Sequence, residues 1–337
     1  LYGWGTNSLN QLGDGTTISK SVPTQIGTSS WKSISAGNDH VLAIGNDNKL
    51  YGWGNFLALN YQGVNYSWTQ LSAGNSHAVG IRSDGLIFAW GSNSSGQLGD
   101  NTAVSKSSPV QIGSSSWTTV SAGTSFSTAL DANNRLFVWG LNYSGQLGDG
   151  TTINRSSPVQ ITSLQTSDAL YNYTAYTGEQ IKSWSQLSIG TSLTFAIDSA
   201  GQLYGWGNNA SGQLGTNSTS VTAVSQPVKI GTSSWSQVNT GGSHVAAIRI
   251  DGLGFIWGDN TVGQLGLNDL VNRSSPVQVG TSSWSQISSG AGFALGTLTN
   301  NILYSWGTGG YALGNGGVNN SSPTVVGMNL FPYSSPV

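Results

Sequence analysis

The sequence predicts an all-β fold, a seven-bladed β-propeller with four-stranded blades, and three observations support this class. The strand pattern Leu-Tyr-Gly-Trp-Gly at residues 1–5 returns in variant form six more times within the 337 residues. A second set of six tryptophans, each preceded by Ser, lies 22 residues before the tryptophan of the next copy. Four short strands fit each repeat of about 50 residues, and radial repetition of such units is typical of propellers. We expect one domain over residues 1–337.

The recurring pattern is predicted to form the third strand of each blade. Its copies occupy residues 1–5, 50–54, 87–91, 136–140, 203–207, 254–258 and 303–307. An aromatic residue stands two positions before each tryptophan, so both rings lie on one face of the strand. The other face carries small or aliphatic side chains. In a ring of blades, the aromatic face of each blade can pack against the face of its neighbour that carries small or aliphatic side chains. The tryptophans are therefore interpreted as structural: Trp4, Trp53, Trp90, Trp139, Trp206, Trp257 and Trp306.

The remaining strands are assigned by their place relative to this pattern. The first strand begins at a tryptophan of the second set, as in Trp31–Ala36, and the second follows at Val41–Ile44. Turns such as Asp84-Gly85 then lead into the third strand, because such residues tolerate positive φ. The fourth strand is predicted at Val22–Ile26 and its equivalents. Most copies begin with proline, which suits an edge strand.

The strand at residues 1–5 lacks the upstream part of a module, which predicts an incomplete blade at the seam of the ring. The chain starts inside a repeat, without an initiator Met or a signal peptide, so we expect a piece of a longer or trimmed polypeptide. Three ways to close the seam stay open. They are the tail Ser321–Val337, residues outside this segment, and a partner chain.

One connection is much longer than the others and is a candidate binding site. Residues 162–183, before the fourth complete module, carry 18 more residues than the usual connection. Long loops on a rigid scaffold are common sites of function, and Tyr gives contact area at low entropic cost. The candidate binding residues are Tyr171, Tyr173, Tyr176, Glu179 and Lys182. A neutral insertion or a contact with a neighbouring subunit is the alternative.

Three histidines share one repeat position and could suggest a metal site. His40, His77 and His244 belong to different blades, however, and the same position holds Phe126, Leu193 and Phe293 elsewhere. A position that accepts Phe or Leu is a packing position, so we predict structural histidines and no metal. The Asp residues of the Gly-Asp-Gly/Asn-Thr turns occur once per blade, too sparsely for a calcium loop, and predict Asx-type turns instead.

The composition excludes several classes of function. Only 7% of residues are charged, the net charge is −2, and the 11 basic residues are scattered, which excludes a nucleic-acid partner that needs a basic stripe. No apolar run is long enough for a membrane span. A single Glu and no nucleophile beside a base predict no enzymatic activity and no cofactor. A weakly charged surface favours an extracellular or virion surface, with a cytoplasmic location as the alternative.

Three motifs in fixed order carry a resemblance to a known family. The Trp-Gly strand, the Gly-Gln-Leu-Gly loop and the segment Ala36–Ile44, which recurs as Ala73–Ile81 and Thr240–Ile248, resemble repeats of the regulator of chromosome condensation family. The resemblance covers essentially the whole chain and implies a seven-bladed propeller. It also implies protein binding. Members include an exchange factor for the GTPase Ran, regulatory modules of ligases and receptors, an inhibitor of β-lactamase, and repeats of bacterial and viral surface proteins.

Three functions are compatible with these observations. The leading prediction is a non-enzymatic interaction scaffold on an extracellular or virion surface, which binds protein or glycan, or other chains of the same particle. The alternatives are an exchange-factor-like regulator of a small GTPase and a protein inhibitor of an enzyme.

Overall fold

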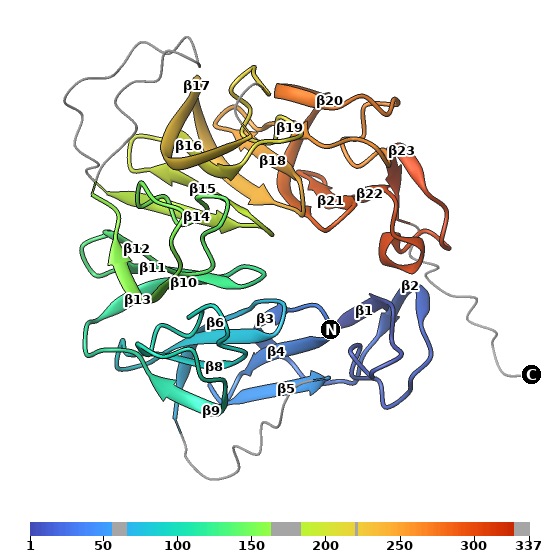
Figure 1. Cartoon of the computed structure of the whole chain (residues 1–337). Helices are drawn as coiled ribbons and strands as arrows, with labels where there is room; N and C mark the ends of the chain where they lie inside the picture. Colours follow the sequence, from blue (N-terminus) through green and yellow to red (C-terminus); the bar gives the residue numbers. More distant parts are fainter. Residues whose placement is uncertain (56–65, 163–182, 220–221, 327–337) are drawn as a thin grey trace, which may run out of the picture.

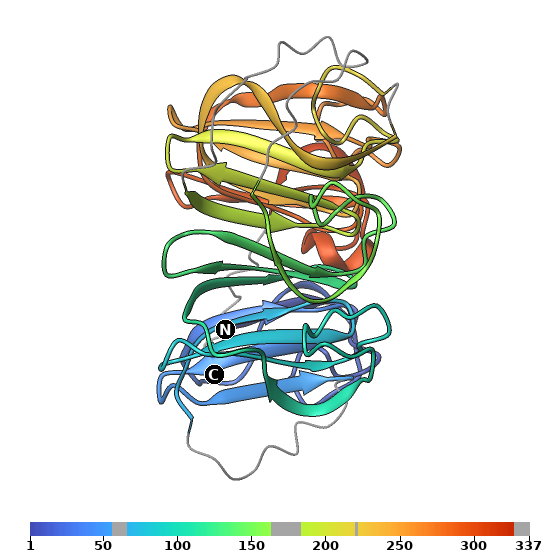
Figure 2. The same cartoon turned by 60° about the vertical axis from the view of Figure 1, so that its left-hand side comes forward.

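The structure is a computed structural model that describes residues 1–55, 66–162, 183–219 and 222–326. Its strands form a ring of antiparallel sheets, and the order of the sheets around the ring follows the chain (Figure 1). Seen from the side, the sheets of successive blades stack face to face (Figure 2). The described residues thus form an all-β, seven-bladed propeller, as the sequence predicts. We number the complete modules as blades 1 to 6 and call the partial unit at the N-terminus the seam blade.

The two inner strands of each blade form an antiparallel pair. The first strand begins at a tryptophan, and its bounds match the predicted Trp31–Ala36. These strands are β3 (Trp31–Ala36), β6 (Trp68–Ala73), β10 (Trp117–Ala122), β14 (Trp184–Ile189) and the later parts of β17 (Ala223–Thr240) and β20 (Arg273–Ser289). The second strands are β4 (His40–Gly45), β7 (His77–Arg82), β11 (Phe126–Asp131), β15 (Leu193–Asp198), β18 (His244–Arg249) and β21 (Phe293–Leu298).

The third strands carry the Trp-Gly pattern and lie close to the predicted ranges. They are β1 (Tyr2–Gly5), β5 (Leu50–Gly54), β8 (Ile87–Gly91), β12 (Leu136–Gly140), β16 (Gln202–Asn208), β19 (Leu253–Gly258) and β22 (Leu303–Gly307). The turns that precede them have the predicted positive φ, for example 81° at Gly85 and 58° at Asn134. The turn chemistry read from the sequence is therefore confirmed.

The outer strands begin earlier than predicted. They are β2 (Lys20–Gln25), β9 (Lys106–Gln111), β13 (Arg155–Gln160), the first parts of β17 and β20, and β23 (Asn320–Val325). In β13, the register slips between the pairs Val138–Val159 and Gly140–Arg155, so Pro158 lies at a bulge inside the strand. The prediction that proline leads the strand is wrong, because the bulge tolerates proline within it. A short 3₁₀-helix, η1 (Gly310–Leu313), follows β22.

Two strands are longer than the sequence predicts. Strands β17 and β20 each run without interruption from the outer edge of one blade into the inner strand of the next. This continuity joins blades 4, 5 and 6 into a single ten-stranded sheet. In contrast, blades 2 and 3 are separate four-stranded sheets, and blade 1 contains three strands among the described residues.

The hydrophobic core lies between blades. In blade 3, Trp117 packs edge-on against Phe137 and tilted against Trp139, with ring centroids 5.0 and 6.5 Å apart. This aromatic face contacts the aliphatic face of blade 2, including Val79 and Ile87. Large side chains of one blade thus meet small ones of the preceding blade, which is the alternation that the strand pattern predicts. Each blade is therefore stabilised mainly by its neighbours.

The seam blade consists of two strands within the described residues. Strand β1 pairs with β2 and with no other strand there. In every other blade, the third strand also pairs with a second strand. The predicted incomplete blade at residues 1–5 is therefore present in the structure, and Figure 1 shows it between blade 6 and blade 1.

Candidate interaction face

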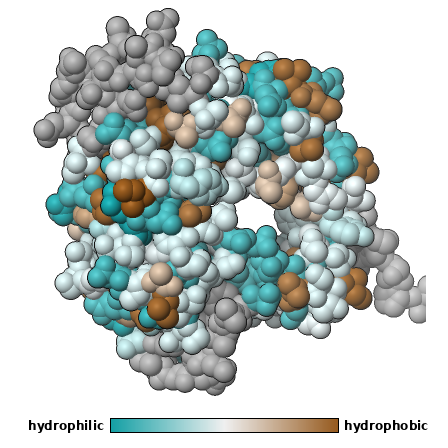
Figure 3. All heavy atoms as spheres, viewed as in Figure 1, coloured by the Kyte–Doolittle hydropathy of each residue, from teal (hydrophilic) through white to brown (hydrophobic). Residues whose placement is uncertain are grey.

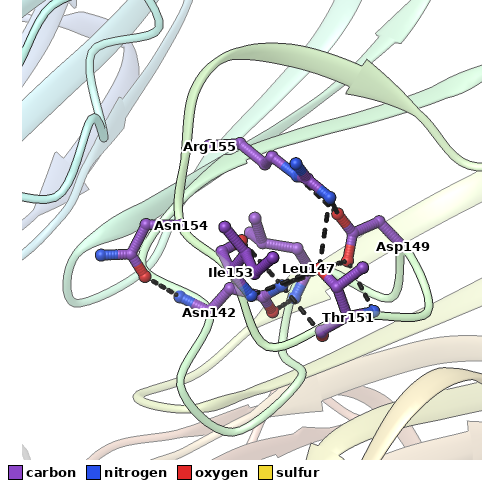
Figure 4. A network of polar contacts seen from close by, with 7 residues as sticks. All are labelled: Asn142, Leu147, Asp149, Thr151, Ile153, Asn154 and Arg155. Carbon is purple, nitrogen blue, oxygen red and sulfur yellow. Dashed lines mark hydrogen bonds and ion pairs between the residues drawn. The ribbon is translucent and has the colours of Figure 1, made fainter.

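The loops between third and fourth strands form one face of the disc, which we call the loop face. In blade 3 this loop is held by the side chain of Asn142, which is fully buried. Its Oδ1 accepts a hydrogen bond of 2.9 Å from the amide of Leu147. Its Nδ2 donates to Asp149 Oδ1 and to the carbonyls of Thr151 and Ile153 at 3.0–3.1 Å (Figure 4). One amide side chain thus holds four residues of the loop.

Asp149 is the second fixed point of this loop. Its Oδ1 accepts from the amide and the hydroxyl of Thr151 at 3.0 and 2.7 Å, and its Oδ2 forms an ion pair of 2.6 Å with Arg155. Burial alone would raise the pKa of Asp149, but the hydrogen bonds from Thr151 and Arg155 outweigh it and keep the pKa lowered. In the seam blade, the backbone and side chain of Thr16 lower the pKa of Asp14 to about 2. These Asp residues are structural turn anchors, consistent with the predicted Asx-type turns.

The same Asn contact recurs around the ring, always three residues after the tryptophan of the third strand. In each case, Oδ1 accepts the amide of the Leu in the following loop, at 2.9–3.0 Å. The five residues are Asn7, Asn93, Asn142, Asn209 and Asn260. This network was not predicted, although its signal, a fixed Trp-x-x-Asn spacing, is visible in the sequence. Asn93, Asn142 and Asn209 also begin glycosylation sequons, but their buried amides are unavailable to modification in the folded state.

The Gly-Gln-Leu-Gly motif connects one blade to the next. The indole Nε1 of Trp206 donates a 2.9 Å hydrogen bond to the carbonyl of Gln146 in the preceding blade. Gly148 lies against the same indole with φ of 76°, and a Cβ at this position would come within 2.5 Å of Nε1. Glycine is therefore required by both conformation and space. Equivalent bonds of 2.8–3.1 Å join Trp4 to Ala312, Trp53 to Gln11, Trp139 to Gln97, Trp257 to Gln213 and Trp306 to Gln264.

Each of five loops also presents one aliphatic side chain to solvent. We call these residues the aliphatic ring, and their side chains are between 59% and 66% exposed. They stand two residues before the start of the outer strand in their loops. They are Ile18, Val104, Ile153, Val271 and Val318. In the view of Figure 3, apolar side chains form separate patches distributed around the disc, with an opening in the middle. The aliphatic ring thus gives the loop face several separate apolar contact points rather than one large apolar patch.

The predicted structural residues occupy the blade interfaces. Trp90, Trp139, Trp206, Trp257 and Trp306 are fully buried, while Trp4 and Trp53, which flank the seam, are only half-buried. His40, His77 and His244 are also buried. Burial lowers the pKa of His77 to about 3 and of His244 to about 4. The Nε2 of His77 forms a hydrogen bond of 2.9 Å with the hydroxyl of Ser127 in blade 3, so this histidine joins two neighbouring blades.

The long connection contains all five predicted binding residues. Tyr171, Tyr173, Tyr176, Glu179 and Lys182 lie outside the described residues. Their proposed role in binding stays a prediction.

The charges of the described residues are mostly neutralised locally. Eight ion pairs join basic residues to nearby Asp residues, among them Lys20 with Asp14, Lys106 with Asp100 and Arg273 with Asp269. Within the same residues, no group of three or more His, Cys, Asp or Glu side chains could hold a metal ion. Nor does any helix of the described chain have the length and apolar character needed to cross a membrane. The loop face therefore offers apolar and hydrogen-bonding contacts rather than a strong electrostatic field.

Family comparisons agree with the repeat geometry. The model of the RCC1-like domain matches residues 57–334, and models of the regulator of chromosome condensation (RCC1) repeat match residues 1–44 and 31–60. The chain belongs to the RCC1-like domain family. Among curated RCC1-related proteins, the human probable E3 ubiquitin-protein ligase HERC3 is 37% identical over 93 residues. The ultraviolet-B receptor UVR8 of Arabidopsis thaliana is also 37% identical over 93 residues.

These curated relatives are matched over short segments. Each alignment covers 27% of this RCC1-like chain, but only 9% of HERC3 and 21% of UVR8. Solved structures match over much greater lengths. Yeast RCC1 (Prp20), solved with bound Kap60, has a TM-score of 0.81 at 18% identity, over 97% of this chain and 83% of that one. Human WBSCR16 has a TM-score of 0.76 at 22% identity, over 93% and 86% of the two chains. At such identities the likeness shows the propeller fold alone.

Proposed function

We propose that this RCC1-like chain is a non-enzymatic protein-binding module that recognises its partner through the loop face. The observation that carries the proposal is the aliphatic ring. Its five side chains are about 60% exposed, yet the loops that hold them are tied down by buried hydrogen bonds. Single exposed aliphatic residues are ordinary on protein surfaces. Five at one repeat position give a partner a regular set of apolar anchors.

The physical advantage of this surface is its rigidity. A partner that binds flexible loops must order them, and the entropy lost reduces the affinity. In blade 3, the backbone of Ile153 is fixed on both sides of its side chain, since its carbonyl accepts from Asn142 and its amide donates to Thr151 Oγ1. Burial of each aliphatic side chain then contributes roughly 25 cal/mol per Å² of apolar area.

A small GTPase is the partner class with the most support. The yeast Prp20p structure, which matches 97% of this chain with a TM-score of 0.79, is described together with its binding to Gsp1p and histones. A curated relative from dog, 34% identical over 85 residues, is named X-linked retinitis pigmentosa GTPase regulator. These names concern those proteins. They favour a regulator of a small GTPase over a scaffold on an extracellular or virion surface. The second hypothesis is supported only by the low proportion of charged residues in the chain.

The test uses a Ran-type GTPase loaded with a fluorescent GDP analogue. Binding to the immobilised chain and release of nucleotide are measured separately. We expect binding to weaken at least about tenfold when Ile18, Val104 and Ile153 are all replaced by Ser, because the anchors are lost. The matched control is Ile250→Ser, since Ile250 is 70% exposed in a turn at the opposite face.

The two readouts separate the parts of the proposal. Binding that depends on the aliphatic ring without faster nucleotide release would support a protein-binding module and exclude the exchange-factor function. Equal binding by the chain and its triple variant would show that the loop face is not the contact surface. No binding at all would remove small GTPases as the partner class.

A further inference from the structure

A set of backbone hydrogen bonds joins the loop of one blade to the outer strand of the next. In each of them, a loop amide donates to the carbonyl of a Ser near the start of that strand, at 2.6–2.9 Å. The donor and acceptor pairs are Asn101 and Ser156, Gly150 and Ser225, Asn217 and Ser274, Asn268 and Ser321, and Gly316 and Ser21. The last pair joins blade 6 to β2 of the seam blade, so this junction holds the two ends of the described ring together.

The donor at this last junction follows an asparagine. Asn315-Gly316 is the single Asn-Gly pair in the sequence. Such a pair is chemically reactive, because the Gly nitrogen can attack the side-chain amide carbon of the Asn and no Gly side chain hinders the approach. A junction between two blades thus contains a group that can modify itself.

The reaction is an intramolecular deamidation that needs only water. The Gly316 nitrogen loses its proton to solvent and attacks Cγ of Asn315. A bond forms between these two atoms, the Cγ–Nδ2 bond breaks, and ammonia leaves after taking up a proton, which yields a five-membered succinimide. Water then opens this ring at one of its two carbonyl carbons and gives aspartate or isoaspartate at position 315. In isoaspartate, the main chain is one methylene longer.

The intact junction hinders this reaction at both reacting groups. The Gly316 N–H donates to the Ser21 carbonyl at 2.9 Å, which directs the nitrogen toward β2. The Asn315 side chain is held by Val318, because Nδ2 donates to its carbonyl at 2.6 Å and Oδ1 accepts from its amide at 3.1 Å. These bonds must break before the two groups can meet, so the reaction requires a local opening of the junction.

Blade 3 has the same backbone contact without the reactive amide. Gly150 donates to the Ser225 carbonyl at 2.7 Å, but the residue before it is Asp149. The carboxylate of Asp149 forms an ion pair of 2.6 Å with Arg155. An ionised carboxylate is a much poorer target for a nucleophile than an amide is. Asp149-Gly150 is therefore an internal control for Asn315-Gly316.

We propose that Asn315 is a site of spontaneous deamidation that reacts when blade 6 separates from the seam blade. The closed junction protects the Asn-Gly pair, and each opening exposes it to attack and hydrolysis. Isoaspartate lengthens the main chain beside the Gly316 amide and moves that amide out of register with Ser21. The modification thus makes a reversible opening of the ring irreversible.

The test measures the rate at which aspartate and isoaspartate form at position 315. The protein is incubated in mildly alkaline buffer, either folded or unfolded in guanidinium chloride, and then digested and analysed by mass spectrometry with electron-transfer fragmentation. We expect the reaction to be at least about tenfold slower in the folded protein, because it requires opening of the junction. Isomerisation of Asp149 in the same samples should be much slower than deamidation of Asn315.

Three variants test the role of the junction. Trp4→Phe removes the neighbouring bond to Ala312 and should accelerate the reaction about fivefold, which corresponds to the loss of one hydrogen bond. Trp139→Phe removes the equivalent bond to Gln97 in another part of the ring and should leave the rate unchanged. Asn315→Gln should give no product at position 315, even when unfolded, because its longer side chain does not form the five-membered ring.

Hydrogen exchange tests the consequence for the ring. After complete reaction, β2 should exchange faster than in the unreacted protein. Asn315→Asp gains the negative charge without the extra methylene, so its β2 should exchange as in the unreacted protein.

Four outcomes would overturn the proposal. Equal rates in the folded and unfolded protein would show that the junction does not protect Asn315, and no product in the unfolded protein would show that the pair is unreactive. Equal acceleration by Trp4→Phe and Trp139→Phe would show that opening of this junction does not control the rate. Unchanged exchange of β2 after the reaction would show that the ring still closes. If Trp4→Phe does not fold, as judged by circular dichroism, the comparison of folded and unfolded wild-type protein decides.

Discussion

The indole Nε1 of Trp4 donates a hydrogen bond of 2.8 Å to the carbonyl of Ala312, 308 residues later in the chain. A second contact of the same kind lies nearby, where the amide of Gly316 donates to the carbonyl of Ser21 at 2.9 Å. On the other side of the seam blade, Trp53 donates to the carbonyl of Gln11 at 3.1 Å. The outer layer of the ring is thus closed by hydrogen bonds on both sides of the seam blade.

Trp4→Phe should open the seam locally. The substitution keeps an aromatic ring but removes the hydrogen bond to Ala312, which should cost about 1 kcal/mol. Hydrogen exchange of β1 and β2 should accelerate, while exchange in blade 3 should not change. Trp139→Phe, which removes the equivalent bond to Gln97, is the control. Faster exchange throughout the ring in both variants would contradict a local role for Trp4.

Trp206→Ala should destabilise the protein by about 3–5 kcal/mol. Trp206 is fully buried, contacts Trp184 with ring centroids 6.2 Å apart and is bonded to Gln146. Chemical denaturation monitored by circular dichroism gives the free energy of unfolding. Trp31→Ala, at a ring that is partly exposed beside the seam, should cost clearly less. A loss below about 1 kcal/mol for Trp206→Ala would mean that the ring contributes little to packing.

Stability should fall as the pH is lowered from about 6.5 to 4. An unfolded His binds its proton near pH 6.5, whereas burial lowers the pKa of His244 to about 4 in the folded chain, against the opposing charge of Asp259. Between these values the unfolded state binds more protons, so acid favours unfolding. The expected slope is up to about 1.4 kcal/mol per pH unit for each such His.

His244→Phe tests this assignment. The equivalent positions of blades 3 and 6 hold Phe126 and Phe293, so the ring should fit. The variant should lose part of the decrease in stability between pH 6.5 and 4, measured by denaturation at several pH values. The residual dependence should come chiefly from His77, whose pKa is also lowered by burial. An unchanged pH dependence would show that His244 is accessible to protons when folded.

Asn142→Asp should destabilise the loop face of blade 3. The change replaces a buried NH₂ donor by a carboxylate 3.1 Å from Asp149 Oδ1, so two like charges would meet where a hydrogen bond now exists. We expect a loss of about 3 kcal/mol, comparable to that for an uncompensated buried charge. Asn46→Asp, at an exposed position, should change stability by less than about 0.5 kcal/mol. Similar losses in both variants would argue against the Asn142 network.

Much of the fold could be predicted because the strand pattern repeats at regular spacings along the sequence. The constant spacing between Trp117 and Trp139, for example, places β10 and β12 in one blade, and the bounds of both strands match. The starting residues of the outer strands were predicted less accurately, because a bulge such as that at Pro158 depends on pairing with β12 rather than on local sequence. The continuity of β17 could not be predicted either, since it depends on how two neighbouring blades align.

Less of the candidate interaction face could be predicted from the sequence. The position of Ile153 is apolar in several repeats, which by itself suggests a core position, and only the structure shows that the side chain is exposed. The role of the Gly-Gln-Leu-Gly motif was also missed, because the bond from Trp206 to Gln146 crosses between blades. Contacts of this kind depend on tertiary geometry that a single repeat does not contain.

The bond between Trp4 and Ala312 also constrains the order of events during biosynthesis. Ribosomes add about 5–20 residues per second, so the acceptor is made roughly 15–60 s after the donor. During that interval β1 and β2 cannot dock on blade 6, and their apolar faces stay open to solvent or to chaperones. Closure of the ring is therefore expected to be a late, non-local step of folding, and nascent chains that stall before residue 312 should be prone to aggregation.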